Sequence, residues 1–303
     1  MPARASAALA GGCLLDAPRS GRYASGDPAE SPSAGFHTMP ESEIATLPSA
    51  AGNVLKRMIL AVQDYSLLSL QSLVNIFTPP TYWSDTLQQM DIIGVGSLPI
   101  IVMASLSIGG VLVLNTASQF QRFGMTDLTG DAVALALVRE LGPTIAALLV
   151  AGRNASGMAS ELGSMIVTEQ VDAMRALGTD PIRKLMTPRV VATLLMMPLL
   201  VAVFDFVGLI GGFAAAYFTL RLGAVQFWTR AIDALEFGDL VQGFTKPIVF
   251  AFIVSTIGCF KGLRVKGGTQ GVGRATTSAV VISSVMVLVS DLFLAKLLLY
   301  IFR

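Results

Sequence analysis

The chain has 303 residues, of which 53% are hydrophobic and only 14% are charged. A soluble domain usually carries about 25% charged residues, so this composition excludes an ordinary soluble protein and indicates one embedded in a bilayer. The formal net charge of +1 gives no reason to expect nucleic acid as a partner. The two cysteines, Cys13 and Cys259, lie in a polar tail and in an apolar run, which does not predict a disulfide framework.

The N-terminal region divides into a polar tail and an amphipathic segment. Residues 1–50 are rich in Ala, Ser, Gly and Pro and show no sustained apolar period, which predicts a disordered tail. In residues 53–77 the apolar side chains recur at helical spacing, with most charges on the other side. We expect this helix to lie in the membrane interface. An ordinary helix packed on a bundle would show the same pattern.

Five apolar runs follow, each long enough to cross a bilayer, for which about 20 residues suffice. We expect transmembrane helices over residues 92–117, 131–163, 189–220, 240–260 and 275–301. The expected fold is therefore all-α and membrane-embedded, with one interfacial helix before five spans.

The basic residues predict which way the spans are oriented, because cytoplasmic loops concentrate Lys and Arg. The segments after the second and fourth spans contain Arg175, Arg183, Lys184, Arg189, Lys261, Arg264, Lys266 and Arg274. The opposite segments contain only Arg122, Arg221 and Arg230. This asymmetry predicts a cytoplasmic N-terminus and, after an odd number of spans, a periplasmic C-terminus.

Two long motifs give the chain a family resemblance. Residues 139–189 read RELGPTIAALLVAGRNASGMASELGSMIVTEQVDAMRALGTDPIRKLMTPR, and residues 258–291 read GCFKGLRVKGGTQGVGRATTSAVVISSVMVLVSD. Together they closely resemble the MlaE/YrbE permeases, in a match that runs from about residue 53 to the C-terminus. Residues 51–303 are thus identified as an MlaE-type permease domain.

The resemblance also implies a function and partners. Members of this family form the membrane homodimer of ATP-driven transporters that move phospholipids or related lipids across the bacterial envelope, from a position in the inner membrane. They work with a cytoplasmic ABC ATPase and a periplasmic lipid-binding MCE-domain protein, often with a small STAS-domain protein. The permease itself is a transport subunit and not an enzyme, so we expect no catalytic residue, cofactor or metal.

The chain lacks the phosphate-binding motif of an ATPase. Residues 267–274 read GGTQGVGR, which only imitates the Walker A pattern because Arg stands in place of its Lys. The run also follows a spanning helix instead of a strand. We interpret it as a flexible loop between the fourth and fifth spans, so the ATPase must be another polypeptide.

A short helix in the long cytoplasmic segment is a candidate for contact with that ATPase. Val167, Val171, Met174 and Leu177 are spaced to share one helix face. The charged and polar residues that we assign to coupling are Glu169, Gln170, Asp172, Arg175 and Asp180. Asp180-Pro181 is expected to open the next helix, as cap and first residue. A helix that merely lies on the membrane remains the alternative interpretation.

Ionisable residues within spans are costly and are candidates for function. Counted at about 1.5 Å per residue, five of them fall in the outer half of the hydrocarbon core and predict one polar layer: Arg139, Glu140, Asp205, Lys246 and Asp291. Either they pair only with one another, or they surround a lipid head group. For lipid binding we select Leu112, Phe120, Phe123, Arg139, Glu140 and Leu141. Ordinary packing explains the apolar members equally well.

Two other functions remain open at this point. A membrane-embedded lipid-modifying enzyme is disfavoured because the spans contain no His and no carboxylate pair beside a nucleophile. A secondary transporter driven by an ion gradient often has internal repeats, and five spans do not divide into two halves.

Overall fold

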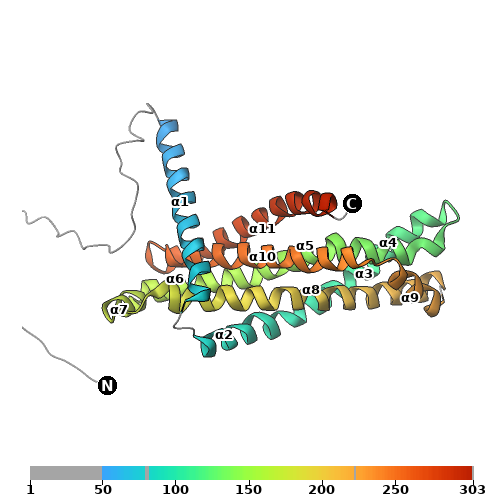
Figure 1. Cartoon of the computed structure of the whole chain (residues 1–303), viewed down its shortest axis with the longest axis horizontal. Helices are drawn as coiled ribbons and strands as arrows, with labels where there is room; N and C mark the ends of the chain where they lie inside the picture. The colour runs from blue at the N-terminus through green and yellow to red at the C-terminus, as the bar shows by residue number, and fades with distance from the viewer. Residues whose placement is uncertain (1–49, 79–81, 222, 302–303) are drawn as a thin grey trace, which may run out of the picture. The chain divides into compact units, whose positions relative to one another are not determined.

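The computed structural model describes residues 50–78, 82–221 and 223–301, and within these ranges every regular element is helical (Figure 1). The all-α class is confirmed, whereas the tail predicted to be disordered lies almost entirely outside the described residues. The α-helices are α1 (Ala50–Phe77), α2 (Trp83–Met90), α3 (Gly96–Gln121), α4 (Thr129–Ala136), α5 (Gly142–Val150), α6 (Ser156–Val167), α7 (Gln170–Ala176), α8 (Thr187–Ala215), α9 (Ala224–Asp233), α10 (Phe237–Leu263) and α11 (Gly268–Ile301).

Within the described residues, five helical stretches are long and apolar enough to cross a membrane, as the sequence predicts. They cover Trp83–Gln121, Thr126–Val167, Ile182–Thr219, Phe237–Leu263 and Gly268–Ile301. Most extend well beyond the expected spans, because a helix continues into the polar interface for as long as its backbone hydrogen bonds can be formed. The membrane limits within each helix stay a prediction.

Several of these helices contain widened π-helical turns. The turns lie at Asp91–Val95, Leu137–Leu141, Ala151–Ala155, Ile182–Met186 and Ala216–Leu220, and a single 3₁₀ turn covers Thr126–Leu128. Two of them end just before a proline, Pro143 and Pro188. A proline ring clashes with the carbonyl four residues earlier and offers no N–H to it, and a widened turn is one way in which a helix accommodates this.

Small residues set the spacing of the central helices. α3 packs along α8 more extensively than any other pair of elements. Where they meet, a Cβ added to Gly109 would lie 1.8 Å from the carbonyl oxygen of Gly208. Such close backbone approach is typical of membrane helices, which gain their association from packing because lipid tails are as apolar as leucine. α10 lies against α5, α6, α8 and α11 and contributes Phe250 to the main core.

α1 contacts the bundle through one side and leaves apolar residues uncovered on another. Leu68 is buried, and the Tyr65 hydroxyl lies 2.7 Å from Thr256 Oγ1. Met58 and Val62 remain exposed. The helix therefore packs on the bundle and also has an apolar surface that suits a membrane interface, where its position stays a prediction.

The glycine-rich run does not form the predicted loop. Gly268–Arg274 is the first two turns of α11, and only the short stretch before it connects to α10. The prediction was wrong because glycine in a helix costs only about 1 kcal/mol, and here close packing requires it. A Cβ on Gly271 would lie 2.1 Å from the carbonyl oxygen of Lys266.

The close contact between α3 and α8 gives a stability prediction with a matched control. Gly109→Ala should destabilise the protein by about 1–3 kcal/mol, because backbone must move to admit the new methyl group. Gly110→Ala should not, since its Cβ would meet its nearest neighbour at 3.6 Å, an ordinary contact. Thermal unfolding of both purified variants in detergent tests this, and equal melting temperatures would contradict the packing described.

Candidate functional site

The second spanning helix is interrupted between α4 and α5. Leu137–Leu141 forms a π-helical turn, closed by a hydrogen bond from the Gly142 N–H to the Leu137 carbonyl. Pro143 follows and lacks the N–H that would bond the carbonyl of Arg139, four residues earlier. The interruption thus leaves a backbone acceptor in the middle of a spanning helix.

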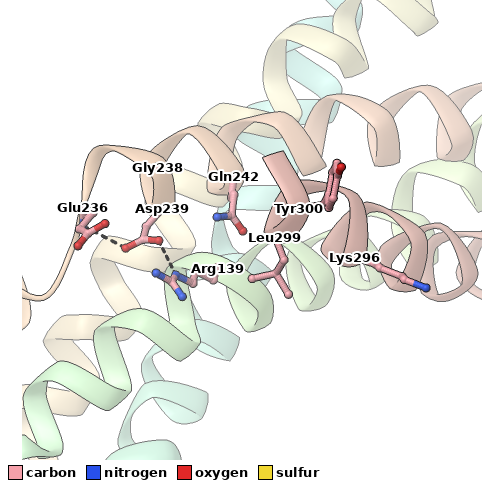
Figure 2. Close-up of a pocket in the computed structure, with 8 residues that line it drawn as sticks. All are labelled: Arg139, Glu236, Gly238, Asp239, Gln242, Lys296, Leu299 and Tyr300. Atoms are coloured by element: carbon pink, nitrogen blue, oxygen red, sulfur yellow. Dashed lines mark hydrogen bonds and ion pairs between the residues drawn. The ribbon is translucent and has the colours of Figure 1, made fainter. Parts of the chain in front are cut away.

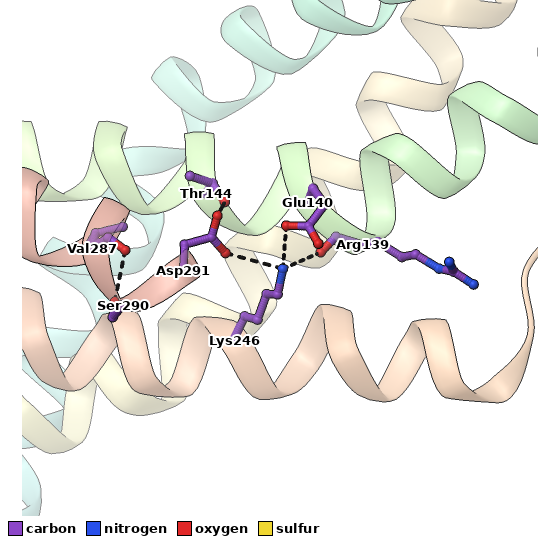
Figure 3. A network of polar contacts seen from close by, with 7 residues as sticks. All are labelled: Arg139, Glu140, Thr144, Lys246, Val287, Ser290 and Asp291. Carbon is purple, nitrogen blue, oxygen red and sulfur yellow. Dashed lines mark hydrogen bonds and ion pairs between the residues drawn. The ribbon is translucent and has the colours of Figure 1, made fainter. Parts of the chain in front are cut away.

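The ammonium of Lys246, on α10, binds this backbone acceptor. It donates to the Arg139 carbonyl at 3.0 Å and lies 2.5 Å from a carboxylate oxygen of Glu140 (Figure 3). It also lies 3.2 Å from Asp291 of α11, whose other oxygen accepts a hydrogen bond from Thr144 Oγ1 at 3.1 Å. The Lys246 side chain is 0% exposed. A buried ammonium requires such compensation, because taking a charge out of water costs several kcal/mol.

Arg139 points away from Lys246 and towards the start of α10. Its guanidinium pairs with the carboxylate of Asp239, which is buried and also accepts a hydrogen bond from the Glu236 N–H at 3.0 Å. Glu236 and Asp239 cap the first turn of α10 reciprocally. The Arg139 side chain is therefore held by a carboxylate that the helix start itself positions.

A pocket of about 590 Å³ opens beside this ion pair (Figure 2). It lies between the start of α10 and the last turns of α11, next to the interruption in the second span. Its lining residues are Arg139, Glu236, Gly238, Asp239, Gln242, Lys296, Leu299 and Tyr300. The pocket thus combines charges of both signs with apolar side chains.

The other residues selected for lipid binding are distributed differently. Glu140 belongs to the Lys246 network, and Leu141 is half-buried beside it. Leu112 and Phe120 are half-buried on α3, and Phe123 lies beyond the end of that helix with 76% of its surface exposed. Of the six residues, only Arg139 lines the pocket.

Asp205 of α8 lies apart from the Lys246 network. Its carboxylate faces Gly142, where an added Cβ would lie 1.8 Å from Asp205 Oδ1. That oxygen is buried and has no hydrogen-bond partner among the described residues. The expected polar layer therefore consists of one connected network, formed by α4–α5, α10 and α11, and a separate carboxyl on α8.

The candidate coupling segment is shorter than the spacing predicts. α6 ends at Val167 and α7 spans only Gln170–Ala176, because Glu169 adopts a left-handed conformation with φ of 57°. Val167 and Leu177 consequently lie outside α7, and Leu177 is 83% exposed. The prediction of one apolar face over all four residues was wrong, since a left-handed residue other than glycine gives no clear sequence signal.

The polar residues of this segment are accessible. Gln170, Asp172 and Arg175 are exposed on α7, and Arg175 Nη1 lies 2.8 Å from Asp172 Oδ1. Asp180 accepts a hydrogen bond from the Ile182 N–H at 3.0 Å, as a capping residue does. The segment thus presents a small polar surface at the end of the second spanning helix.

Sequence reasoning missed two residues of the network. Asp239 stands one position before the expected start of the fourth span and was not selected. The capping pattern of Glu236 followed three residues later by Asp239 was the available signal. Thr144 was missed because a threonine in a spanning helix most often bonds its own backbone.

Comparison with known proteins gives the family. The family model described as Permease MlaE matches residues 86–297. A probable ABC transporter permease protein of Rickettsia typhi is 41% identical over 78% of this chain and 92% of its own length. The intermembrane phospholipid transport system permease protein MlaE of Haemophilus influenzae is 35% identical over 70% and 81%, respectively.

The similarity reaches beyond bacteria. The chloroplastic protein TRIGALACTOSYLDIACYLGLYCEROL 1 of Arabidopsis thaliana is 37% identical over 75% of this chain and 65% of its own length. The family model covers well over half of the chain, and the five apolar helices fit a multi-pass membrane protein. The chain belongs to the MlaE family of membrane permeases.

Proposed function

We propose that the chain is the membrane subunit of an ATP-driven transporter that moves phospholipid between the inner membrane and a periplasmic MCE-domain protein. The observation that supports this most directly is the pocket beside Arg139, in which charged and apolar side chains meet. The name of the Haemophilus influenzae relative supports phospholipid as the substrate class.

The pocket has the chemistry that an amphiphile requires. A phospholipid joins a charged head group to apolar tails. Arg139, Lys296, Glu236 and Asp239 are suited to the head group, and Leu299 and the exposed apolar surface of α11 are suited to the tails. Leu141, two residues after Arg139, and Phe120 of α3 are half-buried and remain further candidates for tail contact.

The orientation follows from the basic residues, with a cytoplasmic N-terminus and a periplasmic C-terminus. In this orientation the pocket faces the periplasm and α7 faces the cytoplasm. A separate ABC ATPase supplies the energy and contacts the polar surface of α7 and its flanking residues, through Glu169, Gln170, Asp172, Arg175 and Asp180. A STAS-domain protein is a further expected partner on the cytoplasmic side.

The permease acts as a homodimer. An ATPase dimer has two-fold symmetry and needs a two-fold membrane partner. α11 is the least buried of the five spanning helices within one chain, which leaves surface for a second copy as well as for lipid. The ion-driven transporter and the lipid-modifying enzyme are disfavoured, because the Rickettsia typhi and Haemophilus influenzae relatives are named as ABC or phospholipid permeases.

Lipid capture tests the pocket with two leucines of the same helix. A photo-cross-linking residue at Leu299, which lines the pocket and is 55% exposed, should capture phospholipid in an amount that changes with ATP. The same residue at Leu292, 71% exposed outside the pocket, should capture bilayer lipid independently of ATP. Mass spectrometry of the adducts measures both. Equal, ATP-insensitive capture at the two positions would mean that the pocket does not bind transported lipid.

The coupling surface is tested by reversing its charges. Replacing Glu169 and Asp172 together by Lys should lower the lipid moved per ATP hydrolysed by about tenfold or more, because it reverses the charge of the surface that contacts the ATPase. The fold should survive, since exposed ion pairs contribute at most about 1 kcal/mol. Asp233→Lys, an exposed reversal on α9, is the control. Unchanged transport and ATPase binding in the double variant would show that α7 is not the contact.

The homodimer is tested in native membranes. A bifunctional amine reagent should trap a species of twice the chain's mass, and native mass spectrometry of the purified complex should find two permease chains with two ATPase chains. A complex that contains a single permease chain would refute the dimer.

A further inference from the structure

The end of α1 and the start of α2 meet the first turn after the coupling segment. A small pocket of about 60 Å³ marks this junction. It is lined by Asn75, Ile76, Tyr82, Trp83, Thr86, Arg183, Thr187, Pro188 and Val191. The end of α1 and the start of α2, which are close in sequence, therefore share one contact region with a segment that is distant in sequence.

Two adjacent cations make the polar contacts of this junction. Lys184 Nζ lies 2.5 Å from Asp85 Oδ2 and 4.1 Å from the centre of the Tyr82 ring. Arg183 Nη2 lies 3.3 Å from both Asn75 Oδ1 and Thr78 Oγ1. Lys184 therefore holds α2, and Arg183 holds the end of α1.

The same two cations stand directly after the coupling segment. Asp180 caps the turn that contains them, and Lys184 N–H donates to the Asp180 carbonyl at 3.0 Å. From Ile182 the π-helical turn Ile182–Met186 continues directly into α8. Only residues 177–181, which include Gly178 with a positive φ and Pro181, separate α7 from the turn that contains Arg183 and Lys184.

We propose that Arg183 and Lys184 are positioning residues for transport, which fasten α1 and the first spanning helix to the coupling segment so that these parts move as one body. This inference rests on the proposed function, because it assumes that the ATPase moves α7. The movement then reaches the first spanning helix through Lys184 and α1 through Arg183, in parallel with the path along α8.

The energetics favour a positioning role over a stabilising one. The side chains of Lys184 and Asp85 are 34% and 38% exposed, and partly exposed ion pairs contribute little to the stability of a fold. Their loss should consequently leave the bundle folded. What it removes is the fixed geometry between α2 and the turn Ile182–Met186.

The first test measures distances in the full chain with its ATPase in lipid bilayers. Cys13 is replaced by Ser, and spin labels are attached to cysteines introduced at Leu87 on α2 and Leu177 after α7, which are both exposed. The Leu87–Leu177 distance should stay constant when nucleotide is added, and should change with nucleotide after Lys184→Glu. If the Leu87–Leu177 distance changes with nucleotide while Lys184 is still present, the inference is overturned.

A second label pair separates this inference from the proposed function. Leu177 paired with Val225, exposed on α9 at the other end of the bundle, reports whether α7 moves at all. If that distance does not respond to nucleotide, the ATP-driven mechanism fails and the inference fails with it. If it responds while the Leu87–Leu177 distance also changes, only the inference fails.

The final test exchanges the charges of the pair. Lys184→Glu should lower the lipid moved per ATP hydrolysed by about three- to thirtyfold, the range in which residues along a coupling network act, with ATPase binding and melting temperature unchanged. Asp85→Lys in the same chain should restore most of the loss. Arg230→Asp, which breaks a comparable pair with Asp131 on the opposite side, is the matched control. Failure of the exchange to restore transport would refute the positioning role.

Discussion

The buried ammonium of Lys246 is the interaction on which the arrangement of the bundle depends. An unpaired charge at this depth would cost several kcal/mol, so the helices around it must supply oxygen atoms at fixed places. Glu140 and Asp291 supply carboxylates, and the Arg139 backbone supplies a carbonyl. Three spanning helices are thereby held at one point. Removing Lys246 would leave the carboxylates of Glu140 and Asp291 without their shared counter-charge, which makes the network sensitive as well as strong.

Elsewhere the bundle is stabilised by close packing of its helices. Water does not drive apolar helices together inside a bilayer, and the close contacts of Gly109 with Gly208, and of Gly262 with Ala159, let backbones approach until dispersion forces suffice. These contacts have no charge and no strong directionality. The ionic network and the glycine contacts therefore have different roles: glycines fix how closely the helices pack, and Lys246 fixes their register and rotation.

The sequence predicts the elements of this fold better than their contacts. Five spans follow from apolar runs, and the charged residues within them follow from the cost of burial. The sequence does not predict that Glu140 meets Lys246 while its neighbour Arg139 meets Asp239, because this depends on helix rotation at a π-helical turn. Glu169 is a second example. It separates α6 from α7 in a left-handed conformation that no residue pattern in the sequence predicts.

The interruption in the second spanning helix explains why one short motif brings so many groups together. Pro143 removes the donor for the Arg139 carbonyl, and the Lys246 ammonium occupies that acceptor. Gly142 has no side chain, and only for that reason can the Asp205 carboxylate of α8 lie against it. The widened turn before them directs Arg139 towards α10 and the pocket, while Glu140 points into the network (Figure 3). With alanine in place of Gly142 and leucine in place of Pro143, the N–H of residue 143 would bond the Arg139 carbonyl, and Lys246 would lose its third oxygen. The added Cβ at residue 142 would also keep Asp205 of α8 away. Backbone geometry at two residues thus determines how the second span joins α8, α10 and α11.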